Sequence, residues 1–149
     1  MIKVVIPVYY TKEYKTKDPK TFLLSLNWYR NAHHMEQNTV KKHLEEVIAN
    51  QLKDTAPINP PFAVSYYYYY TNAASDLPNV GPLASKWLLD TMQHLKLIKN
   101  DSVKYLPEEH YYALPAENNN SRIEAIITEK ENNVTKNTII KRRSKQSVQ

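Results

Sequence analysis

The sequence predicts an α+β domain in which two main helices pack on a mixed β-sheet. Short runs of β-branched and aromatic residues occur near both ends and in the middle of the chain, which is typical of strands. Between these runs, two stretches repeat their apolar residues at helical spacing. The resulting order of elements is roughly β(β)αβαβββ.

The first half of the chain contains a strand, a loop and a helix. Residues 2–10 favour a strand, residues 11–20 a lysine-rich loop, and residues 21–28 a second extended segment. Asn38 is expected to cap the first main helix. The apolar positions of that helix follow helical spacing: Val40, Leu44, Val47, Ile48 and Leu52. Three prolines within residues 55–61 end it.

The second half begins with a strand at residues 62–71. Pro82 suits the first turn of the second main helix, whose buried face holds Leu83, Trp87, Leu88, Met92 and Leu95. Three later runs are expected to be strands: residues 102–106, 111–114 and 122–128. Two polar stretches are expected to be turns between them: residues 107–110 and 117–120.

Composition indicates one domain over residues 1–128, followed by a basic, flexible tail over residues 129–149. The chain has 149 residues, of which 42% are hydrophobic. We expect no signal peptide, and no apolar run approaches the ~20 residues of a membrane span. We therefore expect a cytoplasmic protein, in the host cytoplasm if a phage encodes it. The absence of cysteine excludes disulfides and thiolate zinc sites. The single glycine, Gly81, excludes glycine-rich phosphate loops, and no organic cofactor is expected.

Positive charge is concentrated in a few segments. Residues 129–149 hold six basic and two acidic residues, and therefore +4 of the net charge of +5. Attraction to nucleic acid is then expected from local patches and from the tail. The candidate DNA contacts are basic residues of three segments: Lys12, Lys15, Lys17 and Lys20, then Arg30, then Lys141, Arg142 and Arg143.

Spaced carboxylates around the second helix indicate a metal site. Asp76 and Asn79 precede the helix, Lys86 and Asp90 share one of its faces, and Asp101 follows it. Three carboxylates can hold Mg²⁺ or Mn²⁺, and such a cation assists phosphodiester hydrolysis. The candidate ligands are therefore Asp76, Asp90 and Asp101. Lys86 is expected to contact the scissile phosphate, and Asn79 to position a phosphate or a water.

A structural interpretation of the same residues stays open. Lys86 and Asp90 can form a surface pair one helical turn apart. Asp76 can belong to a turn, and Asp101 can shape an Asx-turn. The spacing alone does not decide between these interpretations.

The stretch from Asp76 to Asp101 resembles the RusA-like Holliday junction resolvases, many of which are encoded by phages or prophages. Lys86, Asp90 and then Asn100-Asp101 match the later half of that family's motif in spacing, and Asp76 with Asn79 matches the first half. Residues 25–30, which read SLNWYR, and Lys41 in the next helix give a second likeness.

The sequence departs from the family pattern at several acids. Asp76 stands alone where the family has two early acids, and Asn100 replaces the first carboxylate of the late pair. The segment between Asn79 and Lys86 is also longer than usual. A site with fewer carboxylates should bind metal more weakly.

The resemblance implies a metal-dependent endodeoxyribonuclease that resolves Holliday junctions or other branched DNA as a homodimer. Two active sites related by a two-fold axis suit paired cuts in a four-way junction. The alternative is a non-catalytic DNA-binding phage protein that retains the fold with a degenerate metal site. A third interpretation is an interaction protein whose acids are all surface residues.

Four further features have both a structural and a functional interpretation. The tyrosine run from Tyr66 to Tyr70 favours a half-buried strand, or rings that stack on unpaired bases. The pair His33 and His34, together with Glu36, suggests a metal only weakly. His94 shares the helix face of Asp90 and can orient it. The acidic stretch from Glu108 to His110 resembles a solvated turn.

Overall fold

The computed structural model describes residues 1–130 and has the predicted α+β class. The strands are β1 (Ile2–Ile6), β2 (Tyr9–Lys12), β3 (Lys20–Leu23), β4 (Phe62–Tyr70), β5 (Glu108–Pro115) and β6 (Arg122–Glu129). The helices are α1 (Leu26–Asn31), α2 (His34–Leu52) and α3 (Leu77–His94). None of the helices within residues 1–130 is long and apolar enough to cross a membrane. The predicted DNA contacts Lys141, Arg142 and Arg143 lie outside the described residues.

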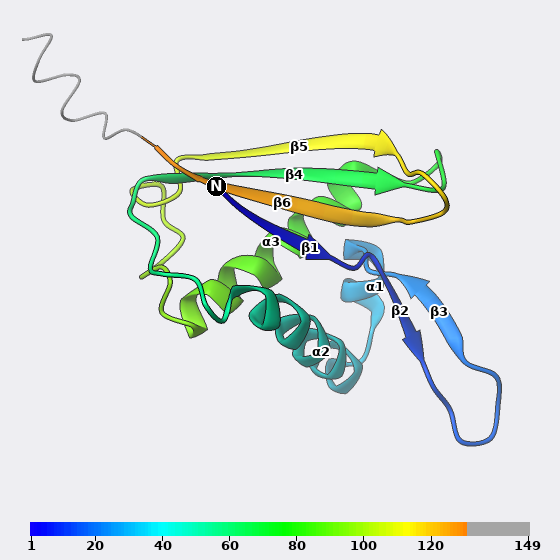
Figure 1. The fold of residues 1–149 in the computed structure, drawn as a ribbon. Helices are drawn as coiled ribbons and strands as arrows, with labels where there is room; N and C mark the ends of the chain where they lie inside the picture. Colours follow the sequence, from blue (N-terminus) through cyan, green and yellow to red (C-terminus); the bar gives the residue numbers. More distant parts are fainter. Residues whose placement is uncertain (131–149) are drawn as a thin grey trace, which may run out of the picture.

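The main sheet has four strands in the order β1-β6-β4-β5, and β2 and β3 form a separate hairpin. β4 and β5 run parallel, with α3 as the crossover between them, whereas β6 is antiparallel to both β1 and β4. In Figure 1, α2 and α3 lie on one face of this sheet, and the hairpin projects away from the body. The fold therefore has a helical side, an open sheet face and one projecting arm.

The core lies between the sheet and the two long helices. α2 contributes the fully buried Val40, Leu44, Ile48 and Leu52, which repeat every four residues along one helical stripe. α3 contributes Leu83, Trp87, Leu88 and Met92, whereas Leu95, predicted on the same buried face, follows the end of the helix and is exposed. Every second residue of β4 and β6 faces these helices: Phe62, Val64, Tyr66, Tyr68, Ile123, Ala125 and Ile127.

Gly81 lets α3 pass close to β5. A Cβ atom at this position would lie 2.6 Å from Cδ1 of the Tyr111 ring, closer than real contacts allow. The Tyr111 ring in turn stacks on Tyr66 of β4, with ring centroids 4.9 Å apart. The single glycine of the chain thus serves helix–strand packing.

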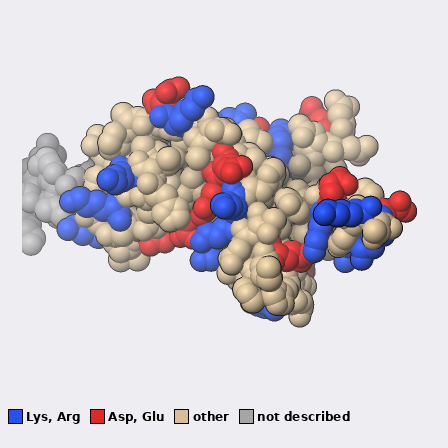
Figure 2. All heavy atoms as spheres, turned by 90° about the horizontal axis from the view of Figure 1, so that it is seen from below, with Lys and Arg blue, Asp and Glu red and all other residues tan. Residues whose placement is uncertain are grey.

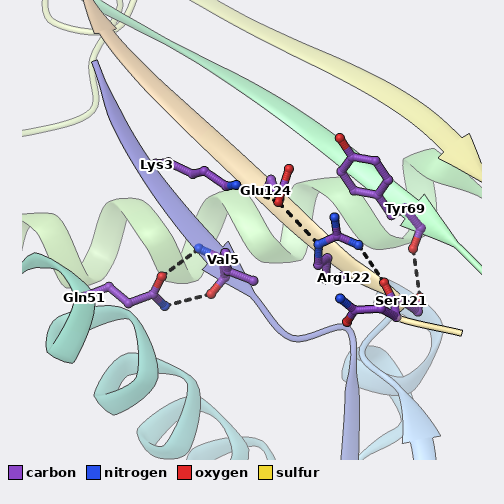
Figure 3. Close-up of polar contacts among 8 residues, drawn as sticks. Lys3, Val5, Gln51, Tyr69, Ser121, Arg122 and Glu124 are labelled. Atoms are coloured by element: carbon purple, nitrogen blue, oxygen red, sulfur yellow. Dashed lines mark hydrogen bonds and ion pairs between the residues drawn. The ribbon is translucent and has the colours of Figure 1, made fainter. Parts of the chain in front are cut away.

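Side-chain hydrogen bonds and ion pairs lie along the β1 edge and on the open face of the sheet (Figure 3). The amide of Gln51, on α2, bonds both the N–H and the C=O of Val5, each at 2.8 Å. These bonds satisfy backbone groups that an edge strand would otherwise leave unpaired. On the open face, Glu124 pairs with Lys3 at 2.9 Å and with Arg122 at 3.4 Å.

Several predicted boundaries differ from the structure in the first half of the chain. Residues 2–10 form parts of two strands, because Pro7 separates β1 from β2. Residues 21–28 are only partly extended, since Ser25 accepts a hydrogen bond from the N–H of Trp28 and caps α1. α2 begins at His34, ahead of the predicted cap Asn38.

In the second half, α3 begins at Leu77 and contains Pro82 inside the helix. The strand predicted at residues 102–106 is wrong: the N–H groups of Tyr105 and Leu106 bond the carbonyl of Ser102, which makes a turn. The turn predicted at residues 107–110 is also wrong, because Glu108 already pairs with Ala63 of β4. The strands predicted at 62–71, 111–114 and 122–128 are confirmed as β4, part of β5 and β6.

Candidate nucleic-acid interface

Two lysines converge on Asp90 where α2 and α3 pack together. Nζ of Lys86, one turn earlier on α3, lies 3.6 Å from Oδ2 of Asp90, and Nζ of Lys41, on α2, lies 3.7 Å from the same atom. Both lysine side chains remain substantially exposed, at 48% and 37%. These distances exceed a good hydrogen bond, so the ammonium groups are held near the carboxylate mainly by charge. Two ammonium groups placed in this way also suit a phosphate.

Glu45 and His94 extend this arrangement into what we call the Asp90 cluster: Lys41, Glu45, Lys86, Asp90 and His94. Oε1 of Glu45 lies 3.8 Å from Nζ of Lys41 and 3.8 Å from Nδ1 of His94. This oxygen is buried and has no hydrogen-bond partner among the described residues. Glu45 was missed in the sequence, although its position four residues after Lys41 on a helix was a usable signal.

Asp76 lies far from the Asp90 cluster and from Asp101. Asp76 stands just before α3 and Asp90 fourteen residues further along, which at 1.5 Å per residue is about 21 Å. Asp101 follows α3 in a segment that is held near the start of β4, because the N–H of Phe62 bonds the carbonyl of Tyr105. Asp76 instead follows the end of β4, which is nine residues long. The two acids therefore lie at opposite ends of a strand roughly 30 Å long.

The expectation that Asp76, Asp90 and Asp101 share one cation within a single chain is therefore not met. Within residues 1–130, no group of three histidine or acidic side chains is arranged to hold a metal ion. The candidate ligands do not fit Mg²⁺ or Mn²⁺ in one subunit, since shared ligation needs oxygens about 2.1 Å from the ion. The physical reason is the length of α3, which separates its first and last acids.

The expected Asx-turn after α3 is formed by Asn100. Its Oδ1 accepts a hydrogen bond from the N–H of Ser102 at 3.0 Å. The side chains of Asp76 and Asp101 are exposed and form no ion pair among the described residues. Asp76 occupies the N-cap position of α3 without accepting a side-chain capping bond. Both carboxylates are thus open to solvent.

The two stretches for which the sequence predicts a RusA-like resemblance meet in space. Oδ1 of Asn79, in the first turn of α3, accepts a hydrogen bond from the N–H of Asn27 at 3.1 Å. The rings of Trp28 and Trp87 pack edge to face with centroids 6.3 Å apart. Asn79 therefore positions α1 against α3, a structural contact beside its predicted role toward a phosphate.

The β2–β3 hairpin presents three lysines on a firmly held base. At the base, Tyr10 packs against Phe22 and His43, with ring centroids 5.7 and 5.5 Å apart. Phe22 stacks on Trp28 at 5.3 Å. The exposed lysines of the hairpin, Lys15, Lys17 and Lys20, form no ion pair within residues 1–130. Figure 2 shows basic side chains gathered at this projecting end of the molecule.

Lys12 differs from the other three lysines of this segment. Its Nζ bonds Oε1 of Glu36 at 2.9 Å, and Glu36 also accepts the indole N–H of Trp28 at 3.1 Å. The hydrogen bond from Lys12 lowers the pKa of Glu36, and the same bond raises the pKa of Lys12. Lys12 thus anchors the hairpin to α2, and its predicted phosphate contact remains a prediction.

The remaining candidates have mainly structural contacts. Arg30 is exposed in the last turn of α1. His33 caps α2 by accepting the N–H of Met35 at 3.2 Å. In the tyrosine run, Tyr66 and Tyr68 are buried, while Tyr67 and Tyr69 lie on the open face. There, Tyr67 stacks on Tyr112 with centroids 5.0 Å apart.

No protein-family model matches this sequence, and no characterised protein matches it significantly.

Proposed function

We propose that this protein binds and cleaves branched DNA as a homodimer of the RusA-like type. The observation that carries the proposal is that the two stretches of RusA-like sequence touch each other, at Asn27 with Asn79 and at Lys41 with Asp90. These contacts join residues 52 and 49 positions apart in the chain. The predicted resemblance thus falls on residues that the fold brings together.

The DNA-binding part of the proposal rests on cationic groups in two places. The Asp90 cluster supplies Lys41 and Lys86 for one phosphate, and the hairpin supplies Lys15, Lys17 and Lys20 for others. The lysine side chains of both surfaces are at least partly exposed, so a phosphate could replace their present contacts with protein or water. The exposed Arg30 and the basic residues 141–143 of the sequence are further proposed contacts, attracted to DNA by their charge.

The proposed cleavage requires acids from two copies of the chain. Asp76 and Asp101 are exposed, but one subunit cannot bring them to a common cation. We therefore propose that, in a homodimer, Asp76 of each subunit shares a cation with Asp101 of the partner subunit. Lys86 lies ten residues along α3 from Asp76, beside Asp90, so we propose that it contacts a phosphate outside this pair of acids.

A mixing experiment tests this arrangement with a four-way DNA junction and Mg²⁺ or Mn²⁺. The variants D76N and D101N should each fail to cleave, while their binding stays unchanged or becomes tighter. After subunit exchange, a mixed dimer of the two variants keeps one intact pair of acids, so nicking should return. The D54N variant, altered at an exposed acid elsewhere, should cleave as the wild type does. Cleavage at the wild-type rate by both D76N and D101N would remove these acids from the proposal.

The second candidate function is a DNA-binding protein of the same fold that does not cleave. It is favoured by the lack of a three-acid group within residues 1–130 and by Asn100 in place of an acid. Junction binding by the wild type without cleavage in either metal would select this candidate. Absence of both binding and cleavage would contradict both candidates.

A further inference from the structure

A cleft of about 660 Å³ opens where the end of α3 meets the proline-rich segment before β4. Its apolar lining comes from Ile58, Phe62, Leu97, Ile98 and Tyr105, with Pro57 and Pro60 beside them. The backbone bond from Ile58 N–H to the carbonyl of Leu97, 2.9 Å long, fixes the two walls relative to each other. The cleft is thus a formed feature of the fold, of the size that holds a few side chains of a ligand.

Two lysines make this apolar cleft electropositive. Lys96 and Lys99 line it, both are exposed, and neither pairs with an acid among the described residues. Gln93 adds a side-chain amide, and no aspartate or glutamate of residues 1–130 lines the cleft. A ligand that matches these walls must carry both negative charge and an apolar group.

Lys96 occupies a backbone conformation that glycine or asparagine would adopt more easily. Its φ is 59°, and its N–H bonds the carbonyl of Gln93 just beyond the end of α3. The lysine is therefore present despite a conformational cost. Its ammonium group on the cleft offers a physical reason.

We propose that this cleft binds an acidic peptide segment of a partner protein, with an apolar side chain of the peptide packed against the exposed Pro57 and Pro60 and the partly exposed Tyr105. Lys96 and Lys99 would pair with carboxylates on either side of that anchor. A nucleic-acid backbone fits less well, since its small, polar sugars cover less apolar surface than a leucine or phenylalanine side chain does. This site is separate from the Asp90 cluster and does not depend on DNA cleavage.

Fluorescence anisotropy with labelled pentapeptides tests the proposal directly. The probes are Asp-Asp-X-Asp-Asp peptides with X as Leu, Ile, Phe, Tyr or Trp, beside a control with X as Ser. At least one probe should bind the full chain with a Kd below about 100 µM, and the Ser control should bind at least ten-fold more weakly. The K96G and K99A variants should each lose at least five-fold in affinity. K53A and K42A, altered at exposed lysines outside the cleft, should bind as the wild type does.

The K96G variant separates binding from folding. Glycine suits the positive φ, so its melting temperature should equal or exceed that of the wild type while peptide affinity falls. The proposal is overturned if no probe binds, if the Ser control binds equally, or if K96G and K99A keep wild-type affinity. If no probe binds and K96G and K99A instead weaken DNA affinity more than K53A and K42A do, the cleft belongs to the DNA surface.

Discussion

Asn79 accepts a hydrogen bond from the backbone of Asn27, and this bond joins the first turn of α3 to the short helix α1. The same part of the chain supports the hairpin, because Trp28 of α1 stacks on Phe22 and bonds Glu36. The proposed DNA arm and the helix that carries Lys86 and Asp90 are therefore connected through one small group of side chains. Substitutions in the hairpin and substitutions on α3 can be tested separately for their effects on DNA binding.

We expect the D90N variant to bind junction DNA about two- to five-fold more tightly. The substitution removes a negative charge that partly neutralises Lys41 and Lys86. Because such exposed ion pairs contribute little, the loss in unfolding free energy should stay below about 1 kcal/mol. Binding at fixed salt and chemical denaturation measure the two quantities. D54N is the matched control, and weaker binding by D90N would show that the carboxylate does not compete with phosphate.

We expect the E36Q variant to lose stability in a pH-dependent way. The hydrogen bond from Lys12 depresses the pKa of Glu36 below its ordinary value of 4.5. Its stabilising contribution is therefore fully present above pH 4.5 and is lost as the pH falls through the lower native pKa. Melting temperatures of the wild type and E36Q should thus differ at neutral pH and approach each other in acid. E46Q, altered at an exposed acid on the same helix, should track the wild type, and a constant difference across pH would contradict the ionic role.

We expect the triple variant K15A/K17A/K20A to bind DNA more weakly and with a shallower salt dependence. Each phosphate contact that is lost should reduce the slope of log K against log[salt] by roughly 0.9. The control is K42A/K53A/K104A, which removes the same charge from three exposed positions outside the hairpin. Equal slopes for the two triple variants would show that only net charge matters.

We expect the G81A variant to be destabilised by about 1–3 kcal/mol, because the new methyl group overlaps the Tyr111 ring. This sign is opposite to the gain of up to about 1 kcal/mol that alanine usually brings inside a helix. A double-mutant cycle with Y111A, measured by chemical denaturation, should show the two changes to be non-additive, with G81A costing less in the Y111A background. An additive result would mean that the overlap is relieved by movement of α3.

Local patterns explain which parts of the fold could be predicted. The helical spacing of Val40, Leu44 and Ile48 reflects one buried stripe, and it predicted most of α2. Residues 102–106 were wrongly predicted to be a strand, because valine, tyrosine and leucine favour strands. The backbone there forms a turn, in which N–H groups bond the carbonyl of Ser102. Residues 107–110 were wrongly predicted to be a turn, because Glu108 and Glu109 are polar. Their parallel pairing with β4 nevertheless makes them part of a strand.

For the candidate site, too, the local relationships could be predicted from the sequence and the long-range ones could not. Lys86 and Asp90 were predicted to share a face because four residues make about one helical turn. Whether Asp101 returns to Asp76 depends instead on where the chain goes after α3, and no local spacing contains that information. The approach of Lys41 from α2 depends likewise on how two helices pack.

The pairing of β1 with β6 has a consequence for how the chain is made. Ile2 lies opposite Ile127, and β6 stands between β1 and β4 in the sheet. A ribosome that adds about 5–20 residues per second needs roughly 6–25 s between the synthesis of these two residues. During that interval β1 has no neighbouring strand, and the sheet is completed only when β6, the last of the described strands, pairs between β1 and β4.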